Sequence, residues 1–400
     1  MKLIIEGSAL VDDHFSGIGQ YVLGILRGLD RLNRSKESGP TVAVAIPFDR
    51  LSRFRRFRFQ NIQAKLIPYP SALAPALLNS SRAPALDTLC GNGLYIFPRY
   101  VSYPLKQSPS AVVIHDLSFK LHREMVAEDN ARFLDDEVKK SLAQCQRVIT
   151  ISQNSAREIH QHYQIPMERI LFAPPAADQK FFYRRPPSEI QNVRSRYGID
   201  SDYILSLSNL EPRKNLDTLV DAYCDLPKDV RDRFGLLLVG AVCWKSEDLV
   251  EKILTRIEQG YNIMRPASYV LDEDKPAIYS GAAAFVYPSH YEGFGMPPLE
   301  ALACGTPVIT SNNSSLPEVV GEVAHLINAD DTEGLSKRIK WLLTRQSSET
   351  EKSIKQGPLQ AETYSWEKSA QVYLDLAFKS RWTDGVRGQM LVSQSTYAPR

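Results

Sequence analysis

The sequence predicts an α/β protein built from two doubly wound domains. Short apolar or β-branched runs alternate with longer amphipathic runs along most of the chain, which is typical of parallel sheets covered by helices. A chain of 400 residues exceeds one ordinary core and favours two domains of roughly 200 residues each. The alternation falters at residues 173–190, where four prolines and little periodicity indicate a linker between the domains.

Four runs in the first half of the chain are predicted to form buried strands. They are KLII (2–5), TVAVAI (41–46), AVVI (111–114) and VITIS (148–152). Helical spacing of apolar residues predicts amphipathic helices at residues 18–32 and 130–146. No element is predicted in the segment 79–110. The first domain is placed at residues 1–178, and the linker at 179–198.

The second half repeats the alternation and predicts a second parallel sheet. Its strands are YILSL (203–207), LLLVG (236–240), AFVYP (284–288), PVIT (307–310) and AHLI (324–327). The second domain is placed at residues 199–364, and residues 381–400 form a tail with no predicted element. Ligands of open α/β sheets bind at the carboxyl ends of the strands, so the residues that follow these runs are the candidates for a site.

The composition favours a cytosolic enzyme and argues against several other classes. No window approaches the ~18 uninterrupted apolar residues of a membrane span, and the first 15 residues do not have the pattern of a signal peptide. The five scattered cysteines form no CxxC pair and no metal-ligand spacing, which favours reduced thiols. The formal net charge of +2 argues against a dedicated nucleic-acid binder.

A glycine-containing turn, SGIGQY (16–21), opens the first long helix. Gly17 and Gly19 would let the backbone approach a phosphate, whose charge is favoured at a helix N-terminus. The alternative is an ordinary glycine turn capped by Ser16. The turn is not a dinucleotide fingerprint, because GxGxxG requires a glycine where Val22 stands. A nicotinamide enzyme is therefore not expected.

His115 and Asp116 directly follow the strand at 111–114. A histidine in this place can hydrogen-bond a sugar hydroxyl or assist proton transfer, and it can equally serve only to cap the strand end. Arg213 and Lys214 follow the strand at 203–207, just before a helix. The helix dipole favours acids at that end, so a pair of cations there predicts an anion site, which we expect to be partly hydrated.

Two glutamates flank the turn HYEGFGMPPLEALACG (290–305). Glu292 is predicted in the loop after the strand at 284–288, and Glu300 near the start of the following helix, where Pro297 or Pro298 suits the first turn. Carboxylates accept paired hydrogen bonds from vicinal diols, which occur in ribose and in pyranose rings. Gly293 and Gly295 would let the loop backbone press against a ligand. The arrangement predicts a nucleotide-sugar site.

These motifs resemble the retaining GT-B glycosyltransferases known as family 4, and the resemblance runs from residue 1 to about residue 380. EGFGMPPLE resembles the family's E-x7-E motif, NLEPRKNL its phosphate-binding segment and SGIGQY its N-terminal glycine loop, while HDLSF and LPEVVG also resemble segments of its members. The resemblance implies a donor site mainly in the second domain and an acceptor site in the first. It also implies that a final helix, at residues 365–380, returns to the first domain.

The resemblance assigns a role to each site residue. Glu300 would hold the ribose hydroxyls and Glu292 the donor sugar. The backbone around Gly293, Phe294 and Gly295 would contact the sugar or the diphosphate. His115 would contact the transferred sugar, and Lys214 would neutralise the diphosphate. The family usually has an arginine where this chain has Asn209, and Arg213 would take its role.

The family mechanism is front-face departure of the diphosphate with retention of configuration. It implies catalysis by positioning and by stabilisation of the leaving group, mainly through Lys214 and Arg213. The chain has no DxD triplet, so no metal ion is expected. Overall similarity to bacterial polysaccharide mannosyltransferases favours GDP-mannose as the donor, with UDP-glucose next, and base contacts are placed in residues 268–274. The alternatives are a nucleotide-sugar epimerase, a phosphorylase or a non-catalytic nucleotide-sugar-binding protein.

The segment RLSRFRRFRFQ (50–60) predicts a further surface. At helical spacing Leu51, Phe54 and Phe57 form one stripe with arginines beside it, from Arg50 to Arg58. This composition is typical of a segment that lies on an anionic membrane, which suits a lipid-linked saccharide acceptor at the cytoplasmic leaflet. The alternative is a solvated loop whose aromatic side chains pack on the domain.

Overall fold

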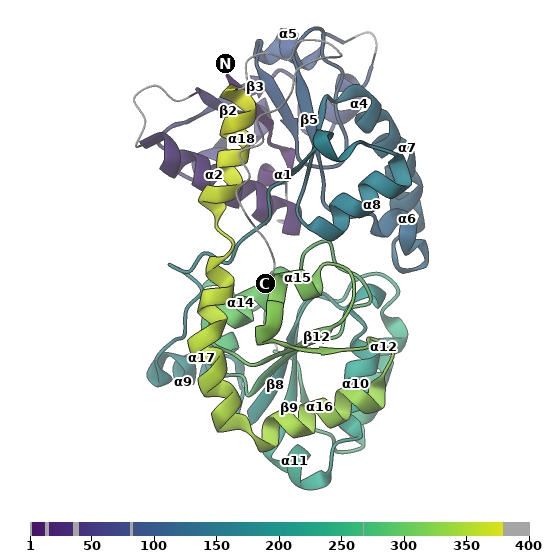
Figure 1. The fold of residues 1–400 in the computed structure, drawn as a ribbon, viewed down its shortest axis with the longest axis vertical. Helices are drawn as coiled ribbons and strands as arrows, with labels where there is room; N and C mark the ends of the chain where they lie inside the picture. The colour runs from purple at the N-terminus through teal and green to yellow at the C-terminus, as the bar shows by residue number, and fades with distance from the viewer. Residues whose placement is uncertain (1, 13–15, 35–39, 81–82, 267, 379–400) are drawn as a thin grey trace.

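The computed structural model of the chain contains two parallel sheets, one above the other in Figure 1, and describes residues 2–12, 16–34, 40–80, 83–266 and 268–378. The first sheet has seven strands in the order β3-β2-β1-β4-β5-β6-β7. The strand bounds are β1 (Leu3–Glu6), β2 (Val42–Pro47), β3 (Ile62–Ile67), β4 (Leu94–Phe97), β5 (Ser110–Ile114), β6 (Arg147–Thr150) and β7 (Ile170–Phe172). The predicted α/β class is confirmed.

The second sheet has six parallel strands in the order β10-β9-β8-β11-β12-β13. Their bounds are β8 (Asp202–Leu207), β9 (Phe234–Val239), β10 (Ile263–Met264), β11 (Ala284–Tyr287), β12 (Val308–Ser311) and β13 (His325–Ile327). The strand order reverses between β8 and β11 in this sheet, and between β1 and β4 in the first. Loops at such reversals leave a crevice at the carboxyl ends of the strands, where ligands bind in this fold class.

All nine predicted runs coincide with strands, and four strands were not predicted. Strand β3 lies at the edge of its sheet and is only partly buried, so Gln63 and Lys65 dilute its apolar pattern. Strand β10 has two residues, and β7 has three at the opposite edge of the first sheet. Strand β4 is fully buried, but it lies within the segment 79–110, for which the sequence predicts no element.

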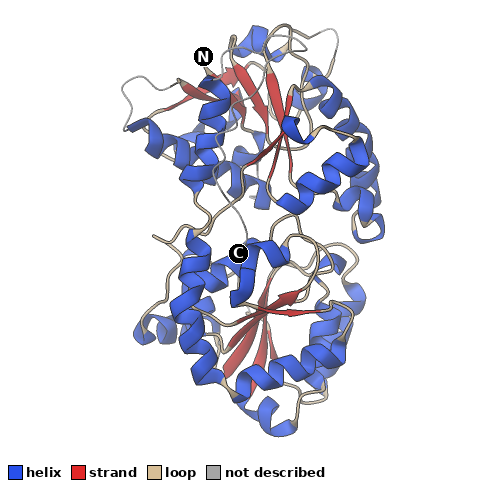
Figure 2. Ribbon diagram, viewed as in Figure 1, coloured by secondary structure: helices blue, strands red, loops and turns tan. Residues whose placement is uncertain are grey.

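Helices cover both faces of each sheet (Figure 2). Those before the linker are α1 (Ser8–Val11), α2 (Gly17–Arg34), α3 (Leu51–Arg55), α4 (Ala74–Leu78), α5 (Leu86–Cys90), α6 (Ser118–Leu121), α7 (Glu128–Gln144) and α8 (Gln153–Tyr163). Those after it are α9 (Pro187–Tyr197), α10 (Leu216–Cys224), α11 (Lys228–Arg233), α12 (Glu247–Glu258), α13 (Lys275–Gly281), α14 (Met296–Ala303), α15 (Leu316–Val320), α16 (Thr332–Thr344), α17 (Gln346–Glu362) and α18 (Trp366–Phe378). None of these described helices is long and apolar enough to cross a membrane.

Helix α9 occupies much of the segment predicted as a linker, 179–198. It begins at Pro187, because proline suits the first turn of a helix. It packs against α13, a helix of the second domain. The chain between β7 and α9 contains no other regular element. The prolines therefore lie in the irregular segment that joins the two domains and at the start of a helix that packs on the second domain.

The last helix, α18, returns to the first domain and packs along α2, as predicted (Figure 1, yellow). The Tyr21 hydroxyl on α2 donates to the Ala173 carbonyl and lies 2.9 Å from the Tyr373 hydroxyl on α18. A Cβ atom at Gly24 would lie 2.4 Å from the Trp366 ring, so this glycine permits the close approach of the two helices. The predicted tail, 381–400, lies outside the described residues.

Candidate functional site

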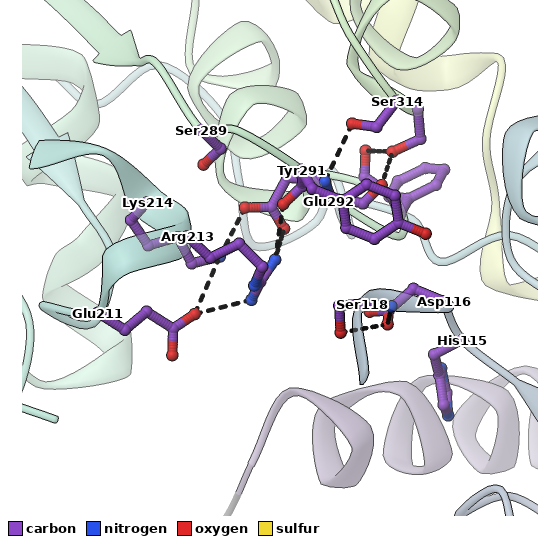
Figure 3. A network of polar contacts seen from close by, with 12 residues as sticks. His115, Asp116, Ser118, Glu211, Arg213, Lys214, Ser289, Tyr291, Glu292 and Ser314 are labelled. Atoms are coloured by element: carbon purple, nitrogen blue, oxygen red, sulfur yellow. Dashed lines mark hydrogen bonds and ion pairs between the residues drawn. The ribbon is translucent and has the colours of Figure 1, made fainter. Parts of the chain in front are cut away.

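A group of four charged side chains, three of them buried and Arg213 half-buried, lies at the strand-order reversal of the second sheet (Figure 3). A 3-10 turn at Pro212–Lys214 follows β8 and carries the two cations, while Glu292 lies in the loop after β11. The Lys214 ammonium donates to Glu292 Oε1 at 2.7 Å and to the Tyr287 hydroxyl at 2.8 Å. The Arg213 guanidinium donates to Glu292 Oε2 at 2.9 Å and to Glu211 Oε1 at 2.8 Å. Two cations thus face two carboxylates.

Burial makes these charges strongly interdependent. Lys214 is 9% exposed and Glu292 6%, while the side chain of Arg213 is 18% exposed, so water reaches the pair of cations mainly at Arg213. Burial alone would raise the pKa of Glu292, but the charges of Arg213 and Lys214 lower it to about 2. Burial and the neighbouring Arg213 charge together lower the pKa of Lys214. Glu292 is therefore an anion at neutral pH, held as the counter-ion of both cations.

Local backbone geometry fixes the two cations in place. Asn215 adopts a left-handed conformation, with φ of 53°, between the 3-10 turn and α10. Its side-chain amide donates to the carbonyls of Pro288 and Ala329, and the His290 amide donates to the Arg213 carbonyl. The turn after β8 is consequently tied to the loop after β11. Figure 3 shows both segments facing the same space.

The glycines after Glu292 allow close contacts within the protein itself. A Cβ atom at Gly293 would lie 2.7 Å from the His115 carbonyl oxygen, so the loop is pressed against the first domain. Gly295 has φ of +106°, which favours glycine, and a Cβ atom there would lie 2.8 Å from Leu316. Phe294 is buried edge-on against Tyr364.

Glu300 lies in a different set of contacts from Glu292. It is the fifth residue of α14, where its Oε2 accepts a 2.8 Å hydrogen bond from the Tyr279 hydroxyl. Burial raises the pKa of Glu300, and the nearby Lys275 partly opposes that shift. Lys275 is itself paired with Asp272 at 2.6 Å, within the segment 268–274. The two glutamates of the motif therefore have separate surroundings on the two sides of the turn.

His115 contributes a neutral imidazole on the first domain's side. Its Nε2 lies 2.8 Å from the Pro98 carbonyl oxygen, which can only accept, so Nε2 carries the proton and Nδ1 has a free electron pair. Burial lowers the pKa of His115, which keeps the ring neutral. The ring packs edge-on against Tyr21 of α2 and Tyr100. Asp116 accepts two hydrogen bonds from Ser118, and Figure 3 shows it facing the Arg213 side.

Of the remaining predicted residues, Gly17 and Asn209 are exposed and Gly19 is buried. Helix α2 begins at Gly17, and the Gly19 amide donates to Ser16 Oγ at 3.3 Å, so the serine caps this end. A Cβ atom at Gly17 would meet nothing within 4 Å, and packing does not explain the glycine. Asn209 is exposed between β8 and the 3-10 turn.

Several residues of the site were not predicted. Glu211 lies within the quoted NLEPRKNL segment, and a carboxylate two residues before an arginine could have been recognised as its partner. The Ser314 hydroxyl accepts from the Glu292 amide, and the Ser315 hydroxyl is shared between the carbonyls of Glu292 and Phe294. No local sequence signal distinguishes these serines, because their role depends on a fold that brings distant loops together. No group of three metal-ligating side chains was found among the described residues.

Known proteins resemble this chain in both sequence and fold. The family described as "Glycosyl transferases group 1" matches residues 189–359. "O-antigen chain mannosyltransferase B" of Escherichia coli is 34% identical over 265 residues, which cover 66% of this chain and 68% of that protein. "Serotype-specific mannosyltransferase WbdA" of Escherichia coli is 32% identical over 286 residues, which cover 69% of this chain and only 34% of that protein.

Two solved structures resemble the whole two-domain arrangement. Anabaena Alr3699/HepE in complex with UDP-glucose has a TM-score of 0.69 at 16% identity, and the match covers 94% of this chain and 98% of that one. WaaG, a glycosyltransferase involved in lipopolysaccharide biosynthesis, has a TM-score of 0.66 at 16% identity and covers 94% of this chain and 100% of its own. At these identities the likeness concerns the fold alone, and it confirms the predicted GT-B arrangement.

Proposed function

This chain belongs to the group 1 glycosyltransferase family, and we propose that it transfers mannose from GDP-mannose to a saccharide acceptor during synthesis of a cell-surface polysaccharide. The observation that carries the proposal is the pair of buried Lys214 and half-buried Arg213 at the strand-order reversal of the second sheet. Cations at that place, beside the start of α10, provide the charge that a diphosphate needs. UDP-glucose is the second candidate donor.

The donor is proposed to lie along the loop after β11. Glu300 would accept hydrogen bonds from the ribose diol, Asn209 would border the diphosphate, and the amides around Gly293, Phe294 and Gly295 would contact the diphosphate or the sugar. The base would lie against residues 268–274. Their backbone offers both hydrogen-bond donors and acceptors. Lys275, which directly follows this segment, lies close enough to Glu300 for its charge to lower the pKa of that carboxyl.

Binding of the diphosphate would change the partners of the cations. In the present structure Glu211 and Glu292 neutralise Arg213 and Lys214, so an incoming phosphate must compete with these carboxylates. We propose that the phosphate takes over part of the contacts of Glu292. The Glu292 carboxylate would then be available to accept hydrogen bonds from hydroxyls of the donor sugar.

The first domain would complete the site. His115 Nδ1 is an acceptor, so it can receive a hydrogen bond from a sugar hydroxyl but cannot protonate a leaving group. Gly17 and Gly19 at the start of α2 would allow the donor or acceptor to approach the backbone. The ring contact between Tyr21 and His115 links that helix to the same region.

The proposed chemistry is transfer with retention of configuration. The bond from the anomeric carbon to the diphosphate oxygen breaks, the acceptor oxygen bonds to the same face, and the acceptor proton passes to the leaving phosphate. Lys214 and Arg213 would stabilise the charge that develops on the diphosphate. Since two cations already serve this leaving group, we propose that the reaction needs no divalent metal ion.

The donor is tested by stability and by turnover. A hundredfold excess of the matching nucleotide diphosphate over its dissociation constant should stabilise the fold by about 2.7 kcal/mol, measured by thermal unfolding. We expect GDP to stabilise more than UDP or ADP at equal concentration. Transfer to an acceptor from GDP-mannose, followed by mass spectrometry, is the matching activity assay. Altered nucleotide sugar formed without acceptor would instead indicate an epimerase, and binding without turnover a non-catalytic protein.

The acceptor is proposed to be a lipid-linked saccharide at the cytoplasmic face of a membrane, with the chain as a peripheral protein. In the structure, Phe54 is buried, and Phe57 and Phe59 stack on each other, so the predicted apolar stripe packs on the domain. The arginine side remains exposed at Arg55, Arg56 and Arg58. The exposed apolar side chains near these arginines are instead Phe48 (50%) and Leu73 (54%). Hydrogen bonds between Asp49 and Ser71 join the two segments that carry them.

Vesicle binding tests this surface. Each basic residue near an anionic membrane contributes about 1 kcal/mol, so the Arg55/Arg56/Arg58→Ala variant should lose most of its co-sedimentation with vesicles that contain anionic lipid. Arg53 is left unchanged because it donates to the Val11 carbonyl. Binding of the wild type should also fade as salt shortens the screening length towards ~3 Å at 1 M. A wild type that stays in the supernatant, or a variant that pellets equally well, would favour a soluble acceptor.

A further inference from the structure

Tyr291, the residue directly before Glu292, inserts its side chain into a socket on the opposite domain. It is 3% exposed, although it lies in a loop of the second domain. Its hydroxyl donates to Glu158 Oε2 of α8 at 2.5 Å and accepts from the Leu117 amide at 3.1 Å. The ring centre lies 4.8 Å from that of His122. The first domain thus holds Tyr291 by a donor, an acceptor and a ring.

The carboxylate of the socket has a second partner on its own helix. The other oxygen of Glu158 accepts a 2.6 Å hydrogen bond from the Asn154 amide, one turn earlier on α8. Burial, together with the nearby carboxylates of Asp116 and Glu158, raises the pKa of Tyr291, so its hydroxyl keeps the proton that it donates. The hydrogen bond therefore has a fixed direction, from the tyrosine to the carboxylate.

The backbone of the same residue belongs to the charged site. The Arg213 guanidinium donates to the Tyr291 carbonyl and to Glu292 Oε2, both at 2.9 Å. Serine hydroxyls hold the next peptide groups, and Gly293 presses on the His115 carbonyl. Tyr291 therefore contacts the first domain through its side chain and Arg213 through its carbonyl. A shift of the Tyr291 backbone as the side chain leaves the socket would change the contact between Arg213 and Glu292.

We propose that Tyr291 is a positioning residue that couples closure of the two domains to the arrangement of Arg213 and Glu292. The inference rests on the transferase function proposed above, because it concerns the same site. Transfer requires the acceptor on one domain to meet the donor on the other with water excluded. Docking of Tyr291 into the socket of Glu158, Leu117 and His122 makes the catalytic arrangement depend on that closed state.

The first test is Tyr291→Phe, which keeps the ring and removes both hydrogen bonds. The turnover number for transfer should fall roughly tenfold, within the range of coupling between linked sites. The dissociation constant of the nucleotide diphosphate should change much less than the turnover number, because most contacts of that ligand are proposed on the second domain. Small-angle X-ray scattering should show a larger radius of gyration for the variant than for the wild type, and this readout does not depend on any activity.

Variants at Glu158 separate hydrogen bonding from a general structural role. Glu158→Gln keeps an oxygen that accepts from Tyr291 and should retain near-wild-type transfer and compactness. Glu158→Ala should behave like Tyr291→Phe, and the double variant should be no worse than either alone, because both remove one shared contact. Lys245→Met is the control. It removes another hydrogen bond between the domains, from Lys245 to the Glu124 carbonyl at 2.7 Å, and should leave transfer within about twofold because it does not touch the loop.

Several outcomes would overturn the coupling. Unchanged turnover and an unchanged scattering curve for Tyr291→Phe would show that the socket is incidental. Equal losses of nucleotide affinity and turnover for Tyr291→Phe would mean that Tyr291 only shapes the donor site. If Glu158→Gln loses as much transfer as Glu158→Ala, the hydrogen bond from Tyr291 is not what matters. If the wild type transfers no sugar but the scattering difference appears, the proposed function fails and the closure contact stands.

Discussion

Replacing Lys214 with methionine is expected to lower the rate of transfer by roughly 10²–10³, or about 2.7–4 kcal/mol of transition-state stabilisation. The ammonium would be the closest cation to the departing diphosphate, and methionine keeps a similar length without charge. Because Lys214 is buried against Glu292 and Tyr287, the substitution also removes contacts from the folded state. Arg213 still pairs with Glu292, so the stability loss should stay within about 1–3 kcal/mol. Steady-state kinetics and denaturant unfolding on the same preparation separate the two effects.

Lys228→Met is the matched control for that experiment. Lys228 lies on the same domain but forms an exposed ion pair with Asp232, one helical turn away on α11. Such surface pairs contribute little, so turnover and stability should both stay close to wild type. Turnover of the Lys214 variant within threefold of wild type, with the fold intact, would remove Lys214 from the mechanism.

The sequence predicts the elements of this site better than their mutual contacts. The strands that carry His115, Arg213 and Glu292 are buried apolar runs with a clear signal, and the position of each residue just past its strand follows from that pattern. The apolar pattern does not indicate which loops contact one another. The pairing of Lys214 with Glu292 joins residues separated by 78 positions, and it exists because β8 and β11 are neighbours in the sheet.

The contacts across the domain boundary were harder still to predict. Tyr291 and Glu158 belong to different domains and are separated by 133 positions. Each reads in sequence as an ordinary polar residue, one in a loop and one on an amphipathic helix. The failure at strand β3 has a related cause, since this edge strand is partly exposed and its polar residues blur the apolar pattern. Strands β7 and β10 contain only apolar residues, but with three and two residues they are too short to form a pattern.

Substituting glutamine at Glu300 should weaken nucleotide binding, whereas the same substitution at Glu292 should not. Glu300→Gln removes a charged acceptor from the proposed ribose contact, so the affinity for free nucleotide diphosphate and for intact donor should both fall roughly tenfold or more, as for a lost hydrogen bond to a charged group. Glu292→Gln instead removes an anion that competes with the diphosphate for Arg213 and Lys214. Nucleotide affinity should then stay the same or increase, while turnover falls roughly 10²-fold because the donor sugar loses its carboxylate partner.

Isothermal titration with the nucleotide diphosphate, paired with transfer kinetics, separates these two roles. Glu349→Gln is the control for the loss of a carboxylate. That residue pairs with His325 on the second domain, away from the strand-order reversal between β8 and β11, and should change neither readout. The prediction depends on the charge arrangement, because Glu292 holds both cations in this structure whereas Glu300 accepts from the neutral Tyr279 hydroxyl. Equal weakening of nucleotide binding by both substitutions would contradict the division. It would mean that Glu292 supports the phosphate site through the placement of Arg213 and Lys214 rather than by contact with the sugar.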